Sequence, residues 1–369
     1  MASSTVRWDD RGTDAARRRE ARAEESMPMV TMSDVARVAK VSASTVSHVI
    51  NKTRAVMPET EKAVRDAIEA TGYSSDGIAR SLRTGTTQTI GLAMSAISNP
   101  YFGDVVHAIE RKITEAGYSL LLADTHDDPA RERQAVKDLL SRRVDAMIVA
   151  PSAEPNLMLD ELVRRGIPTV LIDRVPDETR PGIDAIGVIN DEPNALLVDH
   201  LATHGHRRIA TITSRPGLAT TEERLAGYWA GLERNGLPPD PELAQVGLDS
   251  TGDHTADAVD RLLSLPAPPS AIVLGNNQVT ISTMAALRNR HLEVPRDIVL
   301  VAFDDFSWAD FFHPRLTAIR QPVDELGDRA VTMLLSRIQD RDQPSRHLRL
   351  EPTFVHRESC GCDVHDTTA

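Results

Sequence analysis

The chain has 369 residues, of which 41% are hydrophobic, enough for two or three domains that each bury a core. The formal net charge is −12, but residues 29–85 carry about +2 and the residues after them about −14. Extensive nucleic-acid binding is therefore excluded, and any DNA contact is restricted to one small segment. The sequence has neither an 18-residue apolar run nor a signal peptide, which predicts a cytoplasmic protein.

Residues 1–28 are rich in Arg, Ala, Asp and Glu, and they contain almost no larger apolar side chains. Such a segment buries too little apolar surface to offset the entropy of ordering, so we expect a disordered leader. An arm that follows DNA through Arg17, Arg18 and Arg19 is the alternative for this segment.

Residues 31–51, TMSDVARVAKVSASTVSHVIN, have the pattern of two short helices joined by a tight turn. Ser33 is expected to cap the first helix and Ser42 the second. The apolar seam would contain Val35, Ala36, Val38, Ala39, Val46, Val49 and Ile50. The outward side would carry Ala43, Ser44, Ser47 and His48. This pattern predicts a helix-turn-helix that presents its second helix to DNA, with an ordinary helical hairpin as the alternative.

A third helix is expected from Pro58 to Ala70, because proline at the first turn costs no hydrogen bond and Gly72 can end the helix. Residues 29–73 would then form a compact DNA-binding domain. Residues 74–87 read as a hinge linker with one possible helical turn, which is too short to be stable alone. We expect that turn to become helical only when something docks on it.

From residue 88 onward, short apolar runs alternate with amphipathic helices, which predicts a doubly wound α/β fold. Strands are expected at 90–94, 120–123, 146–150, 169–172, 185–189, 209–212, 271–274 and 299–302. Helices of ten or more residues are expected between most of these strands, for example at 100–116, 129–142, 192–204, 222–235, 256–265 and 278–289. More than six such strands indicate two parallel sheets side by side, with ligands at the carboxyl ends of their strands. The core would span 88–358, divided into subdomain 1 (about 88–188 plus 323–345) and subdomain 2 (about 189–320 plus 346–358).

The two cysteines, Cys360 and Cys362, stand in the last ten residues. Their spacing lacks the second pair or the histidines of a zinc site, so we expect free thiols on a flexible tail, 359–369, and no metal site. His204 and His206, on either side of Gly205, are likewise not expected to bind metal. No cofactor is predicted.

Taken together, these segments resemble the LacI/GalR family of bacterial transcriptional regulators over about residues 30–358. The head resembles the family's helix-turn-helix, and GIARSLRTGTTQTIGL resembles its hinge. NPYF, GIPTVLID, GHRRIA, ERLAG, VAFDDF and HPRLTAIRQP follow in the family's order. The resemblance implies a repressor with a periplasmic-binding-protein-like core, whose affinity for a pseudo-palindromic operator is controlled by a bound metabolite, most often a sugar. It also implies a homodimer, since the chain lacks the C-terminal leucine heptad of tetrameric members.

By the same resemblance, base contacts fall on Ala43, Ser44 and His48, where relatives commonly have Arg at the position of His48. Phosphate-backbone contacts fall on Thr31, Ser42, Thr45, Ser47 and Asn51. In the hinge, Leu82 matches the residue that enters the minor groove, and Ala79 packs against the partner's hinge.

A sugar site combines directional hydrogen bonds with an apolar face. The matching positions are Tyr101, Phe102, Arg174, Arg224, Asn276, Asn277, Asp304 and Gln321, of which Arg224 and Asp304 are the strongest candidates. The structural alternatives are a capping role for Asp304 and a core role for Phe102. A sugar-binding protein or an enzyme with the same core is the alternative function, but the sequence lacks the glycine-rich, GxSxG and HExxH motifs of common enzymes.

Overall fold

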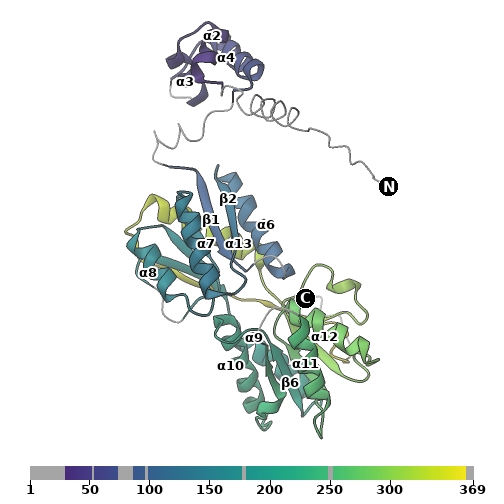
Figure 1. Ribbon diagram of the computed structural model, residues 1–369. Coiled ribbons are helices and arrows are strands. Elements are labelled where there is room, and N and C mark those ends of the chain that lie inside the picture. Colours follow the sequence, from purple (N-terminus) through teal and green to yellow (C-terminus); the bar gives the residue numbers. More distant parts are fainter. Residues whose placement is uncertain are drawn as a thin grey trace, which may run out of the picture. The chain divides into compact units, whose positions relative to one another are not determined.

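The computed structural model describes residues 30–51, 54–73, 86–95, 99–176, 180–247 and 252–362 (Figure 1). The chain divides into two units, a helical head within Met1–Gly85 and an α/β core within Thr86–Ala369. The leader predicted at 1–28 and the hinge positions 74–85 lie outside the described residues. Within the part of the chain that is described, no helix is long and apolar enough to cross a membrane.

The head consists of α2 (Met32–Ala39), α3 (Ala43–Asn51) and α4 (Pro58–Thr71), as the sequence predicted. One apolar cluster holds the three helices together through Val35, Ala36, Val46, Val49, Val64 and Ala67. Val38 was expected in this seam, but its side chain is 45% exposed, because it lies at the border of the buried face, far around α2 from Ala36. Gly72 ends α4 in the left-handed conformation, as predicted.

The cap of α2 differs from the prediction. Thr31, not Ser33, caps the helix, and its hydroxyl accepts a hydrogen bond from the Asp34 N–H at 3.3 Å. The Asp34 carboxylate accepts a reciprocal bond from the Thr31 N–H at 3.0 Å, which completes a capping box. Ser42 caps α3, as predicted, by accepting a bond from the Thr45 N–H at 3.1 Å.

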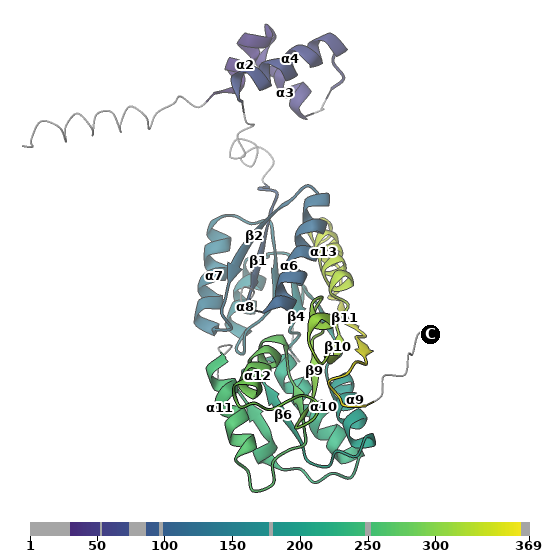
Figure 2. The same cartoon turned by 90° about the vertical axis from the view of Figure 1, so that its right-hand side faces the viewer.

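Two six-stranded sheets form the core, and each defines one lobe (Figure 2). The first sheet contains, in spatial order, β11 (His347–Leu350), β5 (Ile183–Val188), β4 (Thr169–Asp173), β3 (Ala146–Val149), β1 (Thr89–Met94) and β2 (Ser119–Asp124), all parallel. The second contains β12 (Thr353–Val355), β10 (Thr317–Arg320), β9 (Val299–Phe303), β8 (Ala271–Leu274), β6 (Ile209–Thr213) and β7 (Ala244–Val246). Only β12 is antiparallel among these described strands.

Helices cover both faces of each sheet. In the first lobe, α6 (Pro100–Glu115) packs beside α13 (Val323–Gln339), while α7 (Pro129–Ser141) and α8 (Asn156–Arg164) cover the other face. In the second lobe, α9 (Asp191–Thr203) and α10 (Ala219–Arg234) lie opposite α11 (Gly252–Leu263) and α12 (Asn277–Asn289). Two short 3-10 helices, η1 (Pro241–Leu243) and η2 (Ala309–Phe311), complete the second lobe.

The predicted subdomain boundary at residue 346 is wrong. Strand β11 pairs with β5 in the first sheet, and the chain crosses to the second sheet only afterwards, to form β12 beside β10. The chain also crosses between the sheets after β5 and after β10, so three connections join the lobes.

The predicted flexible tail is also wrong at its beginning. Ser359 is fully buried, and its hydroxyl donates to the Leu300 carbonyl at 2.7 Å. Cys360 is only 2% exposed and packs in the apolar core of the second lobe. These contacts fix the chain against the sheet because the backbone at Ser359 also accepts a bond from the Leu300 N–H.

Helices α9 and α10 approach so closely that their contact requires a glycine. A Cβ atom built on Gly227 of α10 would lie 2.0 Å from the Asp191 carbonyl oxygen at the start of α9. No side chain fits that space, so Gly227 fixes the position of α10 and, with it, that of Arg224 one turn earlier.

Candidate functional site

The predicted cleft residues lie at the carboxyl ends of strands or at helix starts in both lobes. Tyr101 and Phe102 begin α6, Arg174 follows β4, Arg224 lies in α10, Asn276 and Asn277 lie at the start of α12, Asp304 follows β9, and Gln321 follows β10. All except Asn276 are buried. The structure therefore brings residues from distant parts of the sequence to the edge where doubly wound sheets bind ligands.

Gln321 connects the two lobes at the centre of this edge. The Tyr101 hydroxyl donates to Asp173 Oδ1 at 2.7 Å and lies 3.1 Å from Gln321 Oε1. The Gln321 amide donates to Asp304 Oδ1 at 2.5 Å, which continues the chain of contacts into the second lobe. Burial raises the pKa of the Asp304 carboxyl, against the opposing effects of Arg224 and Gln321. Burial, followed by the charge of Asp173, also raises the pKa of the Tyr101 hydroxyl.

Arg224 is held by three partners in the second lobe. Its guanidinium donates to Asn190 Oδ1 at 2.9 Å and to the Gly275 carbonyl at 2.6 Å, and Nη2 lies 3.6 Å from Asp304 Oδ1. The guanidinium also lies over the Phe303 ring, 3.7 Å from its centroid. Because the bond donated to Asn190 uses Nε and the one donated to Gly275 uses Nη1, Nη2 remains directed toward Asp304.

Arg174 is the corresponding cation of the first lobe. It donates to the Asp127 carboxylate, its Nε lies 3.8 Å from Asp173 Oδ2, and its guanidinium lies 5.4 Å from the centroid of the Phe102 ring. Burial alone would lower the pKa of Arg174, but Asp127 and Asp173 outweigh burial and raise it. Phe102 is thus both a core residue and the apolar surface beside a buried cation.

Asn276 and Asn277 have different surroundings. Asn276 caps α12, where its side-chain oxygen accepts a bond from the Val279 N–H at 2.9 Å. Asn277 is fully buried, and neither polar atom of its side-chain amide has a hydrogen-bond partner. An unsatisfied buried amide costs about 1–3 kcal/mol, so this side chain is a strong candidate for contact with a ligand.

Backbone strain occurs at two of these positions. Asp173 and Asp304 have φ angles of 66° and 74°, in the left-handed region that residues other than glycine rarely adopt. Each aspartate directly ends or follows a central strand, and the strained backbone directs its carboxylate into the cleft.

Four residues of this network were not predicted as site residues. Asp127, Asp173, Asn190 and Glu223 all bind predicted cleft residues or their neighbours. Asp173 and Asn190 come directly at or after strand ends, a signal that would have identified them. Asp127 and Glu223 carry no such signal, because their roles depend on contacts with residues far away in the sequence.

Two cavities border the network. One, of about 390 Å³, is lined by residues that include Ser152, Arg174 and Glu223, and the other, of about 510 Å³, by residues that include Asp305 and Gln321. Both therefore reach predicted cleft residues from the outside. A further cavity of about 790 Å³ lies between α12 and the loop at residues 312–314, and none of its lining residues belongs to the predicted cleft.

The head places the predicted DNA-contacting residues along the start and outer side of α3. Ser42, Ala43 and Ser44 are exposed, while Thr45, Ser47 and His48 are half-buried. The Ser42 hydroxyl lies 2.7 Å from that of Ser44 and 2.8 Å from that of Thr45. Asn51 ends α3, and its side chain lies outside the described residues, as do Ala79 and Leu82.

Comparison with known proteins agrees with both units. Residues 31–76 match the family of bacterial regulatory proteins described as lacI family, and residues 198–360 match the periplasmic binding protein-like domain. The ribose operon repressor of Escherichia coli (strain K12) is 38% identical over 343 residues, covering 90% of this chain and all of that protein. The transcriptional repressor PurR of Aliivibrio salmonicida is 33% identical, covering 90% of this chain and 99% of that repressor.

Solved structures extend the similarity to the fold. The lac repressor dimer bound to operator and the anti-inducer ONPF has a TM-score of 0.79 at 27% identity, covering 90% of this chain and 99% of that chain. The complex of the transcriptional regulator CelR with cellobiose has a TM-score of 0.68 at 26% identity, covering 89% of this chain and 99% of that chain.

A helix-turn-helix head followed by a two-lobed core with a buried polar cleft defines a DNA-binding regulator that responds to a small ligand. The chain belongs to the LacI family of bacterial transcriptional regulators. It is therefore a transcriptional repressor with an effector-binding core rather than an enzyme.

Proposed function

We propose that the effector of this repressor is a small sugar, which binds between the lobes and controls operator affinity. The observation that carries the proposal is the buried chain of contacts from Asp173 through Tyr101, Gln321 and Asp304 to Arg224, which draws on both lobes. A ligand that replaces some of these contacts acts on the angle between the lobes.

The chemistry of the cleft favours a polyhydroxylated ligand. Asp173 and Asp304 offer acceptors, Arg174 and Arg224 offer donors, and Asn277 offers both through its unpartnered amide. Neighbouring hydroxyls of a sugar match such mixed donors and acceptors, and the Phe102 ring supplies an apolar face. The similarity to the ribose operon repressor supports this choice. A nucleobase, whose ring nitrogens and exocyclic groups also pair with mixed donors and acceptors, is the competing ligand.

A panel of ligands tests the proposal through the melting temperature of the purified protein. D-Ribose, D-xylose, D-galactose and cellobiose are compared with adenine, guanine and hypoxanthine, because a ligand that binds only the native state raises its stability. We expect one sugar to raise the melting temperature in a saturable way. Stabilisation by a purine and by none of the sugars would assign a purine effector instead.

In the head, we assign base reading to Ala43, Ser44 and His48. The exposed position of Ala43 and Ser44 at the start of α3 supports this role, since the first residues of a recognition helix reach base edges. Ala43 suits a thymine methyl group, and His48 suits a purine acceptor.

We assign contacts with the phosphate backbone of the DNA to five polar residues: Thr31, Ser42, Thr45, Ser47 and Asn51. The hydroxyls of Ser42 and Thr45 stand at the N-terminus of α3, where the helix dipole favours an anion. Thr31 already uses its hydroxyl in the cap of α2, so a phosphate contact there competes with Asp34. For the hinge, Leu82 is proposed to enter the minor groove with Ala79 against the partner chain.

We propose that the repressor acts as a homodimer in the cytoplasm, where its operator is located. Edge strand β2 offers a surface on which a second chain can pack, because Leu120 and Leu121 are only half-buried and Leu122 is 40% exposed. An uncovered apolar edge strand is a site for association. Two heads related by two-fold symmetry match a pseudo-palindromic operator, and movement of the lobes would change the pairing of the two hinges.

A further inference from the structure

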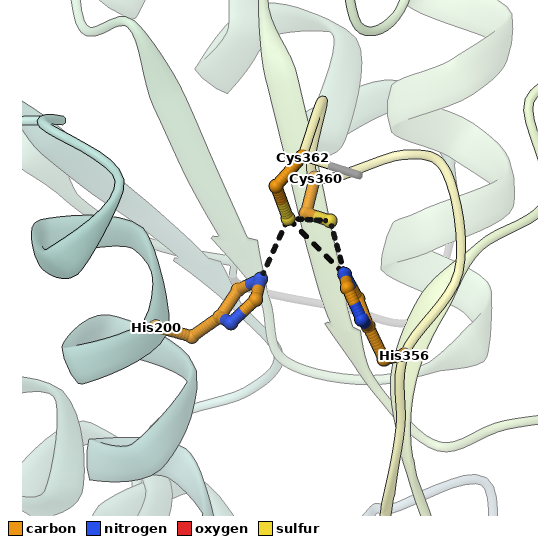
Figure 3. A group of neighbouring side chains, drawn as sticks. All are labelled: His200, His356, Cys360 and Cys362. Carbon is orange, nitrogen blue, oxygen red and sulfur yellow. Dashed lines mark hydrogen bonds between the residues drawn. The ribbon is translucent and has the colours of Figure 1, made fainter. Parts of the chain in front are cut away.

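We propose that His200, His356, Cys360 and Cys362 bind one Zn²⁺ ion in a four-coordinate structural site of the second lobe. Each residue offers one ligand atom, and these four atoms all lie within 4.8 Å of one another. Figure 3 shows the two imidazole rings directed at the neighbouring sulfur atoms, His200 from a helix on one side and His356 from a separate segment on the other. His200 comes from α9, and the other three residues follow β12 at the end of the described chain.

The contacts within the cluster are close and mutual. His356 Nε2 lies 3.2 Å from Cys360 Sγ and 3.1 Å from Cys362 Sγ, and His200 Nε2 lies 3.3 Å from Cys362 Sγ. In a tetrahedral zinc site with Zn–S near 2.3 Å and Zn–N near 2.0–2.1 Å, neighbouring nitrogen and sulfur ligands are about 3.5 Å apart. The three nitrogen–sulfur distances are within about 0.4 Å of that value.

The two sulfur atoms need a larger adjustment. Cys360 Sγ and Cys362 Sγ lie 2.6 Å apart as free thiols. Two thiolates on one zinc ion lie about 3.8 Å apart, so each sulfur must move by roughly half an ångström, which small side-chain rotations supply.

The ligand set is that of a closed structural zinc site. Two cysteines and two histidines fill all four positions of a tetrahedral ion and leave none for a substrate. Thiols are weak hydrogen-bond donors and acceptors, so the cluster gains little from its own hydrogen bonds.

The surroundings of the cluster shield it partly from water. Cys360 is buried, and Cys362 packs against the apolar core of the second lobe. The Phe354 ring lies 5.2 Å from the ring of His200 and stacks beside that of His356 at 6.2 Å. Such a shell limits the access of water and of competing ligands to metal–thiolate bonds.

Gly361 lets both cysteines face the same side. Its φ angle of 71° lies in the left-handed region, and a Cβ atom there would meet Pro295 at 3.2 Å and Val299 at 3.4 Å. A bound ion would fasten this turn to α9. It would thereby hold the segment in which Arg357 binds Asp305, the residue next to Asp304 of the cleft.

Metal analysis of the full-length protein, purified without chelator and with any histidine tag removed, tests the proposal. We expect about one zinc ion per chain by mass spectrometry. After the metal is stripped and the thiols are reduced, Co²⁺ alone should give the visible bands of a tetrahedral ion together with a thiolate-to-cobalt charge-transfer band. Added Zn²⁺ should displace the cobalt and raise the melting temperature.

Variants distinguish this site from adventitious binding. His200→Ala and Cys362→Ser, both at incompletely buried positions, should each weaken Zn²⁺ binding by about tenfold or more. Gly361→Ala should weaken it through the strained turn. His204→Ala is the matched control, because the His204 ring lies beside that of His200 but its Nδ1 contacts the His200 carbonyl. This variant should bind zinc as the unchanged chain does. Any of four results would overturn the proposal. These are no zinc uptake by the reduced protein, copper in place of zinc, a Cys360–Cys362 disulfide that persists after reduction, and an equal loss of zinc binding in His204→Ala.

Discussion

Arg349 on β11 donates two hydrogen bonds to Glu223 on α10, at 2.7 and 3.2 Å, and so joins the first lobe to the second. Glu223 also accepts a bond from Asn190, which in turn accepts one from Arg224. The bridge between the lobes is therefore connected to the cation that we assign to the effector. It lies at the rim of the cleft, since Arg349 and Glu223 are 34% and 24% exposed.

Glu223→Gln removes the charge of this bridge and keeps the size of the side chain. A partly exposed ion pair contributes up to about 1 kcal/mol, so we expect effector affinity to fall by up to about fivefold with little loss of global stability. The matched control is Glu222→Gln, whose carboxylate accepts a bond from Gly217 within the second lobe. Isothermal titration of both variants makes the comparison. An equal loss in the control would mean that the bridge has no special part in holding the lobes together.

His48→Ala tests base reading by the head. If His48 contacts a base, its removal should relax the preference at one operator position by about 1–3 kcal/mol and leave the other positions unchanged. Ser47→Ala, at an assigned phosphate contact, should instead weaken all operators by a similar factor. Affinities for a set of single-base operator variants at one salt concentration decide the matter. A uniform loss in His48→Ala would show that the ring touches only the phosphate backbone.

A buried ion pair in the first lobe predicts acid sensitivity. Arg337 donates to Asp184 at 2.7 and 3.2 Å, and Arg346 adds two further bonds. Burial alone would raise the pKa of Asp184, but these bonds outweigh it and lower that pKa below the usual 3.8. The pair's contribution to stability is therefore complete above about pH 4 and is lost as the pH falls through the folded-state pKa.

Asp184→Asn leaves the guanidinium of Arg337 buried without its counter-charge, which should cost about 3–5 kcal/mol at pH 7. Urea unfolding between pH 7 and pH 3 should show a smaller acid-induced loss in the variant than in the unchanged chain. Equal acid sensitivity in both proteins would place the cause of acid unfolding elsewhere.

Gly227→Ala tests the close contact between α9 and α10. The added methyl group would overlap the Asp191 carbonyl, so we expect a loss of about 1–3 kcal/mol in the free energy of unfolding. Gly103→Ala, in α6, is the control: a Cβ atom there meets nothing within 4 Å, and alanine should stabilise the helix by about 0.5–1 kcal/mol. Similar destabilisation by both substitutions would show that helix packing is not the cause.

The sequence predicted most central strands because buried parallel strands are short, continuous apolar runs. It missed β7, β10, β11 and β12, which are three or four residues long and mostly lie at or near sheet edges. In β11, exposed and half-buried residues alternate, so the strand lacks an apolar run. Helix α13 was missed although Leu326, Ala330 and Leu334 recur at helical spacing, because the strand and helix alternation used for the prediction stops near residue 302. The nine-residue α8 was missed as well.

The structure brings the predicted cleft residues together, whereas the cysteine cluster was not predicted, and the difference has a physical reason. Asp304 and Arg174 stand directly after strands, so the rule that ligands bind at strand ends identifies them. Cys360 and Cys362 are brought to His200 only by folding of the C-terminal segment against α9, across about 160 positions of sequence. No local pattern records such a contact.

The central claim is that a sugar in the cleft changes operator affinity through both lobes. Asp304→Asn tests it most directly, because asparagine tolerates the left-handed backbone and removes only the charge that faces Arg224. The measurement is fluorescence anisotropy of a labelled operator with and without the sugar identified by thermal shift. We expect about a tenfold change in operator affinity for the unchanged protein, little change for Asp304→Asn, and equal operator affinity of both proteins without sugar. An undiminished response in Asp304→Asn, or no response to any sugar in the unchanged protein, would contradict the account.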